Sequence, residues 1–198
     1  MQLPFAIYIL DTETTGLDAL KNEVIELSIY RLNDNKQNTW CIKPQQYDTI
    51  SIESFRINHH KIEDLKHQTE FGKNTYKELK QVLPLIENFF MEDGEASDAR
   101  ILVGQNCNFD LGFLREMWIR ENAMDTFPFG NRPKMIDTMQ LALFLDLVNG
   151  EKSQYYNLKT LIQKYGIKNS KAHTAEADTL ATKELFVAQL TAVQNMNK

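Results

Sequence analysis

The feature that most constrains the fold is an apolar run that ends on two carboxylates. Phe5 to Leu10 carries no charge, and Asp11 and Glu13 follow it in the segment DTETTG. Such a run predicts a strand that is buried on both faces. Residues two apart on a strand point to the same side, so both carboxylates can face one point. Because like charges repel one another, a divalent metal bound by oxygen ligands is the simplest group that would offset the repulsion.

The hydrophobic pattern of the rest of the chain predicts an α/β fold. Strands are expected at residues 5–10, 24–31, 39–43, 101–103 and 135–137, and helices at 76–90, 109–122, 138–148, 157–165 and 174–193. Residues 44–72 are expected to be irregular, apart from one helical turn at 62–65. This order favours a mixed sheet of about five strands with helices on both faces, formed by residues 1–198 as a single domain.

Composition limits the classes of partner. The net charge of -5 argues against a broad basic surface wrapped on duplex nucleic acid. The charge does not exclude a small binding site for nucleic acid, because two bound divalent cations would bring the formal charge of the protein to about -1. The two cysteines, Cys41 and Cys107, favour reduced thiols and a cytoplasmic location. No stretch approaches the ~20 apolar residues that span a membrane, so no membrane partner is expected.

Three more residues carry chemistry. They are Asp110 in QNCNFDLGFL, and His173 and Asp178 in HTAEAD. We expect Asp178 in the second turn of the last helix, Thr174 as its N-cap, and His173 on the loop before it. A histidine suits proton transfer at neutral pH. Three Asp and one Glu favour Mg²⁺ or Mn²⁺ over zinc, and two such ions clamp the oxygens of a phosphodiester displacement. The set therefore predicts a phosphodiesterase.

The three segments resemble the three motifs of the DEDDh exonucleases, the DnaQ-like family of 3′–5′ exonucleases with a ribonuclease H-like fold. The resemblance runs from about residue 5 to residue 190. It includes weaker similarities in KMIDTMQLA, NLKTLIQKYGI and HHKIED. The resemblance implies that Asp11, Glu13, Asp110 and Asp178 hold two Mg²⁺ or Mn²⁺ ions, and that His173 is the general base.

The resemblance also implies a cradle for the 3′-terminal nucleotide. The residues implied to line it are Thr14, Thr15, Leu17, His60 and Phe109. An aromatic face and an apolar wedge bind any base by stacking, without reading sequence. Two assignments have structural alternatives, because Phe109 could equally be a core aromatic and His60 could belong, with His59, to an exposed polar turn.

Other positions depart from the family or have structural explanations. The family often has His where this chain has Gln105, which can still hydrogen-bond, and Gly where it has Lys61. Asp137 is expected to be structural, because four carboxylates already suffice for two ions. The acidic loop 92–98 is expected in solvent. Core positions are expected for Leu141, Leu143, Phe144 and Leu145.

The leading functional expectation is a metal-dependent 3′–5′ exonuclease that releases nucleoside 5′-monophosphates from DNA, either free-standing or of the proofreading type. The expected partners are 3′ ends of nucleic acid, single-stranded in the first instance. A DNA polymerase is a further partner if the enzyme is of the proofreading type. One alternative is an exoribonuclease of the ribonuclease T or oligoribonuclease type, because recognition of the 2′-OH depends on pocket shape. The others are an accessory subunit that binds a polymerase and an inactive binding module, against which the intact set of five residues argues.

Overall fold

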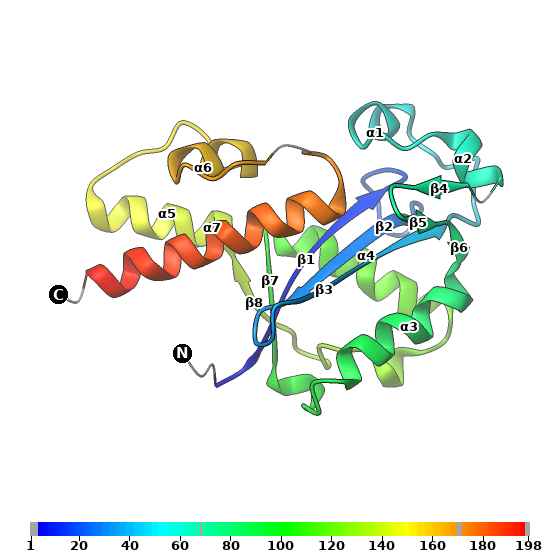
Figure 1. Cartoon of the computed structure of the whole chain (residues 1–198), viewed down its shortest axis with the longest axis horizontal. Coiled ribbons are helices and arrows are strands. Elements are labelled where there is room, and N and C mark those ends of the chain that lie inside the picture. Colours follow the sequence, from blue (N-terminus) through cyan, green and yellow to red (C-terminus); the bar gives the residue numbers. More distant parts are fainter. Residues whose placement is uncertain (1–3, 68, 170–171, 197–198) are drawn as a thin grey trace.

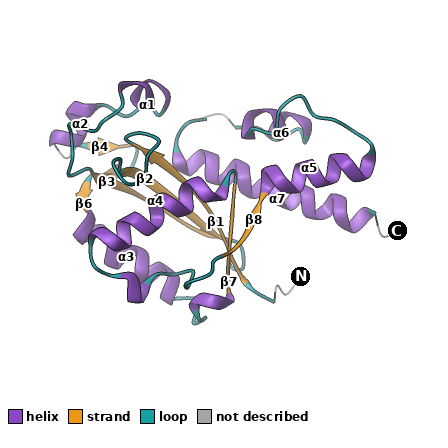
Figure 2. Cartoon of the chain, turned by 180° about the vertical axis from the view of Figure 1, so that it is seen from behind, coloured by secondary structure: helices purple, strands orange, loops and turns teal. Residues whose placement is uncertain are grey.

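The structure is a computed structural model of the whole chain, and it describes residues 4–67, 69–169 and 172–196. A mixed sheet in the order β6-β3-β2-β1-β7-β8 has helices on both faces (Figures 1 and 2). Its strands are β1 (Ala6–Thr14), β2 (Val24–Arg31), β3 (Lys36–Lys43), β6 (Lys77–Glu78), β7 (Arg100–Gly104) and β8 (Lys134–Asp137). The helices are α1 (Ile52–Ile57), α2 (Ile62–His67), α3 (Leu79–Met91), α4 (Cys107–Arg120), α5 (Thr138–Asn149), α6 (Leu158–Lys164) and α7 (Ala175–Asn195), with short 3₁₀ turns at Ser97–Ala99 and Met124–Thr126. The predicted fold class is confirmed, and the two-residue β6 adds a sixth strand at the edge.

The central strand is longer than the sequence pattern predicts. We expected β1 to end at residue 10, but its antiparallel pairing with β2 continues through Glu13↔Glu26 and Thr14↔Val24. The two carboxylates of the DTETTG segment therefore lie within the strand. The strand propensity of these residues does not explain the length of β1. The extra length comes from pairing with β2, which is buried at every position.

Side-chain alternation along β1 decides which face carries the carboxylates. The apolar even-numbered residues of β1 belong to the larger core, which α3 and α4 cover. Ile7 and Ile9 instead pack with Phe186 of α7. Asp11 and Glu13 continue this odd-numbered series. They therefore face the side of the sheet on which α7 lies.

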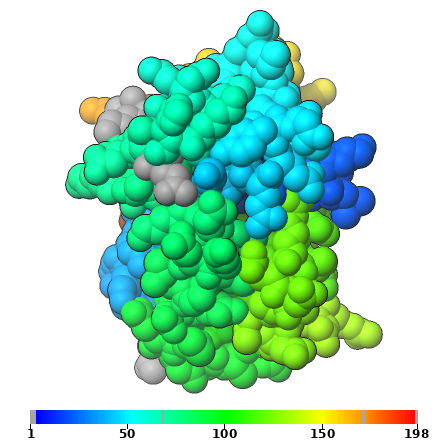
Figure 3. Space-filling view, turned by 90° about the vertical axis from the view of Figure 1, so that its right-hand side faces the viewer, coloured from blue at the N-terminus to red at the C-terminus, as the bar shows by residue number. Residues whose placement is uncertain are grey.

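Residues 44–78, which we call the cap segment, hold more regular structure than expected. They contain α1, α2 and a hairpin of β4 (Glu70–Phe71) and β5 (Asn74–Thr75) in addition to β6. Leu65 and Tyr76 form a small core of their own against Ile25 and Cys41. Figure 3 shows the segment, in cyan and teal, above α3 and α4. Elements this short carry too few residues for a periodic pattern to reveal them.

Two expectations about burial are wrong. Leu145 of α5 is buried and Leu141 is half-buried, but Leu143 and Phe144 are 48% and 54% exposed. Consecutive residues of a helix point in different directions, so a helix that packs on one side leaves some of its consecutive apolar residues in solvent. The acidic loop is not wholly solvated either, because the side chain of Asp93 is only 6% exposed and binds Arg100 at 2.7 Å.

Both cysteines are free and buried. Within the ranges that the structure describes, no helix has the length and apolar character needed to cross a bilayer.

Candidate active site

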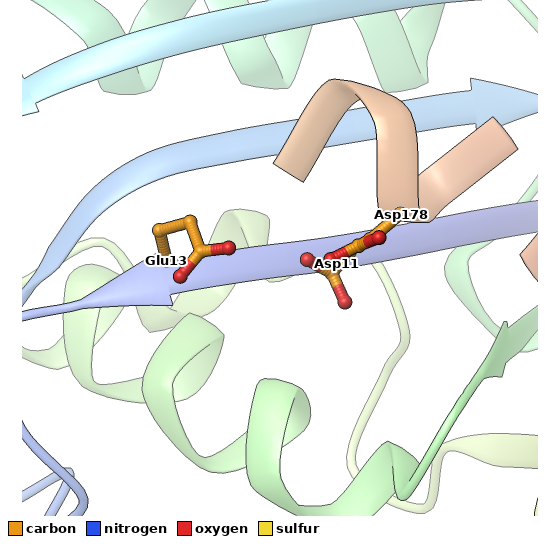
Figure 4. Close-up of side chains that lie close together, drawn as sticks. All are labelled: Asp11, Glu13 and Asp178. Atoms are coloured by element: carbon orange, nitrogen blue, oxygen red, sulfur yellow. The ribbon is translucent and has the colours of Figure 1, made fainter. Parts of the chain in front are cut away.

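Three of the predicted ligands meet beside the first turn of α7. One carboxylate oxygen each from Asp11, Glu13 and Asp178 lies within 4.8 Å of the others (Figure 4). Asp178 is in the first turn of α7, not the second, because the helix begins at Ala175. The predicted N-cap is confirmed, since the Thr174 side chain accepts a hydrogen bond from the α7 backbone. We call these three carboxylates the trio.

Asp110 reaches β1 from α4, on the other side of the strand. The Oδ1 atom of Asp110 accepts hydrogen bonds from the Thr12 backbone amide (3.0 Å) and from the Thr12 hydroxyl (2.8 Å). The pairing of β1 with β7 ends at Ile9↔Val103, so β1 has no partner in β7 beyond that point. The Asp110 carboxylate accepts the hydrogen bond of the Thr12 amide there. Asp110 lies outside the mutual 4.8 Å limit of the trio, yet it is a direct electrostatic neighbour of Asp11.

Burial and mutual repulsion make the carboxylates hold protons tightly. Burial, followed by the charges of Asp110 and Glu13, raises the pKa of Asp11 well above its usual range. Burial and then Glu26 raise the pKa of Glu13 to about 8. Burial raises the pKa of Asp110 to about 7, and raises that of Asp178 against hydrogen bonds that lower it. A cluster of this kind is stabilised either by protons or by a cation.

His173 stands at the rim of the trio, on the loop before α7 as predicted. Its side chain is exposed, and its backbone amide donates to Asp178 at 3.0 Å. Its φ of +69° is unusual for a residue other than glycine, and so is the φ of +60° at His59, whose ring centroid lies 6.2 Å away. Backbone strain of this kind concentrates at functional sites. The backbone of His173 is therefore fixed to a carboxylate of the trio, while its imidazole is open to solvent.

The loop after β1 is held by its own polar groups. The Thr14 hydroxyl donates to the carbonyl of Gly16 at 2.6 Å, and the Thr15 hydroxyl accepts from the Glu23 amide at 2.9 Å. Both threonines are buried, so their side chains shape the turn. Leu17, by contrast, is 82% exposed at the tip of the loop. Of the predicted cradle residues in this loop, Leu17 offers a side-chain surface to a ligand.

The structure places His60 in the interior. Its ring stacks on Phe71 with centroids 3.8 Å apart. Its Nε2 lies 3.3 Å from the Glu26 carboxylate, and its Nδ1 is bonded to the Tyr76 hydroxyl. The side chain is fully buried, so in this conformation it does not offer the predicted contact to a nucleotide. Its neighbour His59 is exposed instead.

Two further predicted residues lie at the start of α4. Phe109 is partly buried against the larger core, with its ring centroid 4.9 Å from that of Phe113. It therefore packs in the core while part of its ring stays open. The structural role predicted for Asp137 is confirmed, because it caps α5 and accepts from the Cys107 amide at 2.9 Å.

Glu26 is a further residue of the site that the motifs did not predict. This residue is buried in the middle of β2, and its Oε2 accepts from the Ala175 amide at 3.1 Å as well as lying near His60. It thus joins the start of α7 to the cap segment. The available signal was one acidic residue inside the apolar strand VIELSIY. An unpaired carboxylate there would be costly, so its presence indicates buried partners.

Comparison with known proteins agrees with this geometry. A sequence model of the RNase_T family, described as exonuclease, matches residues 8–186. The chain belongs to this exonuclease family. This confirms the predicted exonuclease family. The predicted fold agrees with solved exonuclease structures, among them the nuclease domain of a DEDDh family member.

Several relatives of this exonuclease are much longer proteins. It is 29% identical over 180 residues to the PolC-type DNA polymerase III of Lacticaseibacillus paracasei, and 30% identical over 180 residues to that of Thermotoga maritima. These alignments cover 91% and 90% of this chain but 11% of each polymerase. The chain thus spans about a tenth of the length of these relatives.

Solved structures share the fold at low sequence identity. Escherichia coli ExoI in a zinc-bound complex with single-stranded DNA has a TM-score of 0.74 at 16% identity, over 97% of this chain and 41% of ExoI. The nuclease domain of 3′hExo, a DEDDh family member bound to rAMP, has a TM-score of 0.70 at 15% identity, over 93% of this chain and 91% of that domain.

Proposed function

We propose that this exonuclease is a metal-dependent 3′–5′ enzyme that releases nucleoside 5′-monophosphates from single-stranded nucleic acid, with DNA as its first substrate. The observation that carries the proposal is the trio, with ligand atoms within 4.8 Å of one another beside the exposed His173. A module that only binds nucleic acid has no need of clustered, half-buried carboxylates, because their mutual repulsion and lost hydration cost stability without a cation.

The donor set fits Mg²⁺ or Mn²⁺. Every trio donor is a carboxylate oxygen, which suits hard divalent cations. Both bonds from Thr12 go to Oδ1 of Asp110, which leaves Oδ2 able to bind an ion. We assign a second ion to Asp110 together with the trio. When bound, two such cations supply positive charge to the attacking and leaving oxygens of the phosphodiester.

His173 is assigned the proton transfer. It takes a proton from the attacking water while the water oxygen bonds to phosphorus. The bond from phosphorus to the 3′-oxygen of the penultimate nucleotide breaks, and this oxygen takes up a proton from solvent to become the new 3′-hydroxyl. The terminal nucleotide therefore leaves with a 5′-phosphate. The exposed ring can pass its proton to solvent. The bond between the His173 amide and Asp178 keeps the base in register with the ligands.

Two findings bear on the substrate. The polymerase relatives act on DNA by name, and ExoI was solved with single-stranded DNA, which supports DNA. The 3′hExo nuclease domain was solved with rAMP, which supports RNA as the second candidate. A polymerase partner is a further proposal, supported by the PolC relatives and testable by co-purification.

Digestion of matched oligomers tests the polarity and the substrate together. A 5′-labelled single-stranded DNA 20-mer, incubated with Mg²⁺, should give a descending ladder and free 5′-monophosphates. The RNA 20-mer of the same sequence should be degraded more slowly. A circular single strand should survive, because it offers no 3′ end. Cleavage of the circle would instead indicate an endonuclease, and faster loss of the RNA would favour the exoribonuclease alternative.

A further inference from the structure

The charge of this chain is divided unevenly between one segment and the rest. Residues 152–175 contain five lysines and no Asp or Glu. Since the whole chain has 22 basic and 27 acidic side chains, the remainder has 17 basic residues against all 27 acidic ones. The segment includes α6 and leads directly into His173 and the start of α7. A basic stripe on an otherwise acidic protein is the electrostatic footprint of a polyanion.

Two of these lysines are available on the surface of α6 and the loop that precedes it. Lys152 and Lys159 are exposed and make no ion pair among the residues that the structure describes. Lys164 differs, because it binds Asp146 and Glu151 and is therefore neutralised within the fold. Lys168, which follows α6, is exposed as well. Of these exposed lysines, Lys159 lines the groove described next.

Two neighbouring hollows that share Leu158 lie along α6 beside the active site, and together we call them the groove along α6. The first, about 420 Å³, is lined by His173 and Asp178 of the site and by Leu158 and Lys159 of α6. The second, about 660 Å³, is lined by Leu158 and Tyr155. In Figures 1 and 2, α6 and the β1–β2 loop lie on opposite sides of the first turn of α7. A strand whose terminal nucleotide lies at that loop would therefore leave the site toward α6.

Tyr155 is presented on an anchored backbone. The carbonyl of the next residue, Tyr156, accepts from Gln105 at 2.6 Å, and the Tyr156 hydroxyl donates to Asp146 at 3.1 Å. On the other side, the Ser153 amide donates to Asp146 at 2.7 Å. The Tyr155 ring itself is 58% exposed. Stacking of a nucleotide base requires an exposed aromatic ring on a restrained backbone, and Tyr155 meets both conditions.

We infer that the groove along α6 holds the body of the single strand, upstream of the scissile bond, with Tyr155 as a stacking platform and Lys159 as a phosphate contact. This inference rests on the proposed function and adds the path of the substrate. Stacking and phosphate contacts are sequence-tolerant, as an exonuclease that must process any sequence requires.

Binding of a fluorescent strand tests the platform without catalysis. The probe is a 5′-fluorescein thymidylate decamer, titrated in Ca²⁺ and followed by anisotropy. Tyr155→Ala should weaken binding about 5-fold or more, the usual cost of one lost base–aromatic stack. Tyr155→Phe keeps the ring and should bind like the wild type. Lys159→Gln should reduce the slope of log K against log salt by about 0.7, whereas Lys80→Gln, an exposed lysine on α3, should leave it unchanged.

Substrate length supplies the second readout. With Mg²⁺ and unlabelled thymidylates of 2 to 10 nucleotides, the KM of the wild type should fall as the substrate lengthens. Tyr155→Ala should lose this gain at an unchanged kcat, and should match the wild type on the dinucleotide. An equal loss on dinucleotide and decamer would overturn the inference, because the residue would then act at the terminal nucleotide or on the fold.

The two proposals fail in distinguishable ways. If the wild type digests the thymidylates while Tyr155→Ala and Lys159→Gln bind the decamer within 2-fold of it, the path along α6 is wrong and the exonuclease proposal stands. If the wild type digests nothing, the exonuclease proposal is wrong, and the anisotropy titration still decides whether α6 binds a strand.

Discussion

His173 and the carboxylates differ in what their removal should cost. Asp11→Ala removes a ligand, so metal binding and rate should both collapse. His173→Ala leaves the trio intact. Mg²⁺ should therefore still raise the melting temperature, while the rate falls about 10²–10⁴-fold through loss of the general base. Higher pH should recover part of the rate, because more water is then ionised without help. Thermal melts with and without Mg²⁺, beside initial rates at pH 7 and 9, check this. Near-full activity at pH 7, or loss of the Mg²⁺ shift, would show that the role of His173 is assigned wrongly.

Glu26 should matter although it touches no substrate. Glu26→Ala leaves the Ala175 amide and His60 without their carboxylate in a buried setting. We expect a loss of about 1–3 kcal/mol in the free energy of unfolding. The rate should also fall, since the start of α7 carries Asp178. Glu26→Gln keeps an acceptor oxygen and should recover part of both. Urea unfolding and initial rates measure the two effects, and an alanine variant that unfolds and reacts like the wild type would refute the role.

At the scale of elements, the β1–β2 loop has a specific steric requirement. A Cβ at residue 16 would collide with the Asn22 side chain, which donates to the Thr49 carbonyl at 2.7 Å. Gly16→Ala should therefore destabilise the protein by about 1–3 kcal/mol through overpacking. Gly112→Ala is the matched control, because its Cβ would meet Ala19 at an ordinary 3.8 Å within α4. It should be neutral or stabilise the protein by up to about 1 kcal/mol, as an alanine in a helix does. Urea unfolding of both variants measures this, and an equal effect would contradict the account.

The elements also show why sequence reasoning reached the site but not its surroundings. Motif spacing and the two-residue period of a strand sufficed to bring Asp11 and Glu13 together, because both are local. The role of Glu26 depends on partners 34 and 149 residues away, which no local pattern reports. The burial of His60 depends likewise on Phe71 and Tyr76, contributed by short elements without periodicity. The exposure of Leu143 and Phe144 depends on which side of α5 packs against the protein. Because α5 carries apolar residues on all sides, its sequence does not show which side that is.

At the scale of the whole molecule, stability should depend on pH and metal together. In the metal-free protein, Glu13 and Asp110 have pKa values of about 8 and about 7, far above those of an unfolded chain. The folded state therefore retains protons that the unfolded state has lost, and stability should fall as pH rises from about 4.5 to about 8. Mg²⁺ at 100 times its dissociation constant should add about 2.7 kcal/mol per site, most clearly at the upper end of this range.

Thermal melts at pH 5 and pH 8, each with EDTA and with Mg²⁺, check this linkage. Glu13→Gln removes one of the titrating groups, so its metal-free melting temperature should depend less steeply on pH than that of the wild type. A wild type whose pH dependence is no steeper than that of Glu13→Gln would contradict the assignment.

The central claim is that the trio carries out metal-dependent hydrolysis, and the rate of nucleotide release against free Mg²⁺ tests it most directly. Asp178→Asn removes a trio ligand, and Asp125→Asn alters an exposed carboxylate in the turn Met124–Thr126 as a control. We predict no release by the wild type in EDTA, recovery as Mg²⁺ is added, no recovery by Asp178→Asn, and recovery by Asp125→Asn. Release in EDTA, or wild-type recovery by Asp178→Asn, would contradict the account.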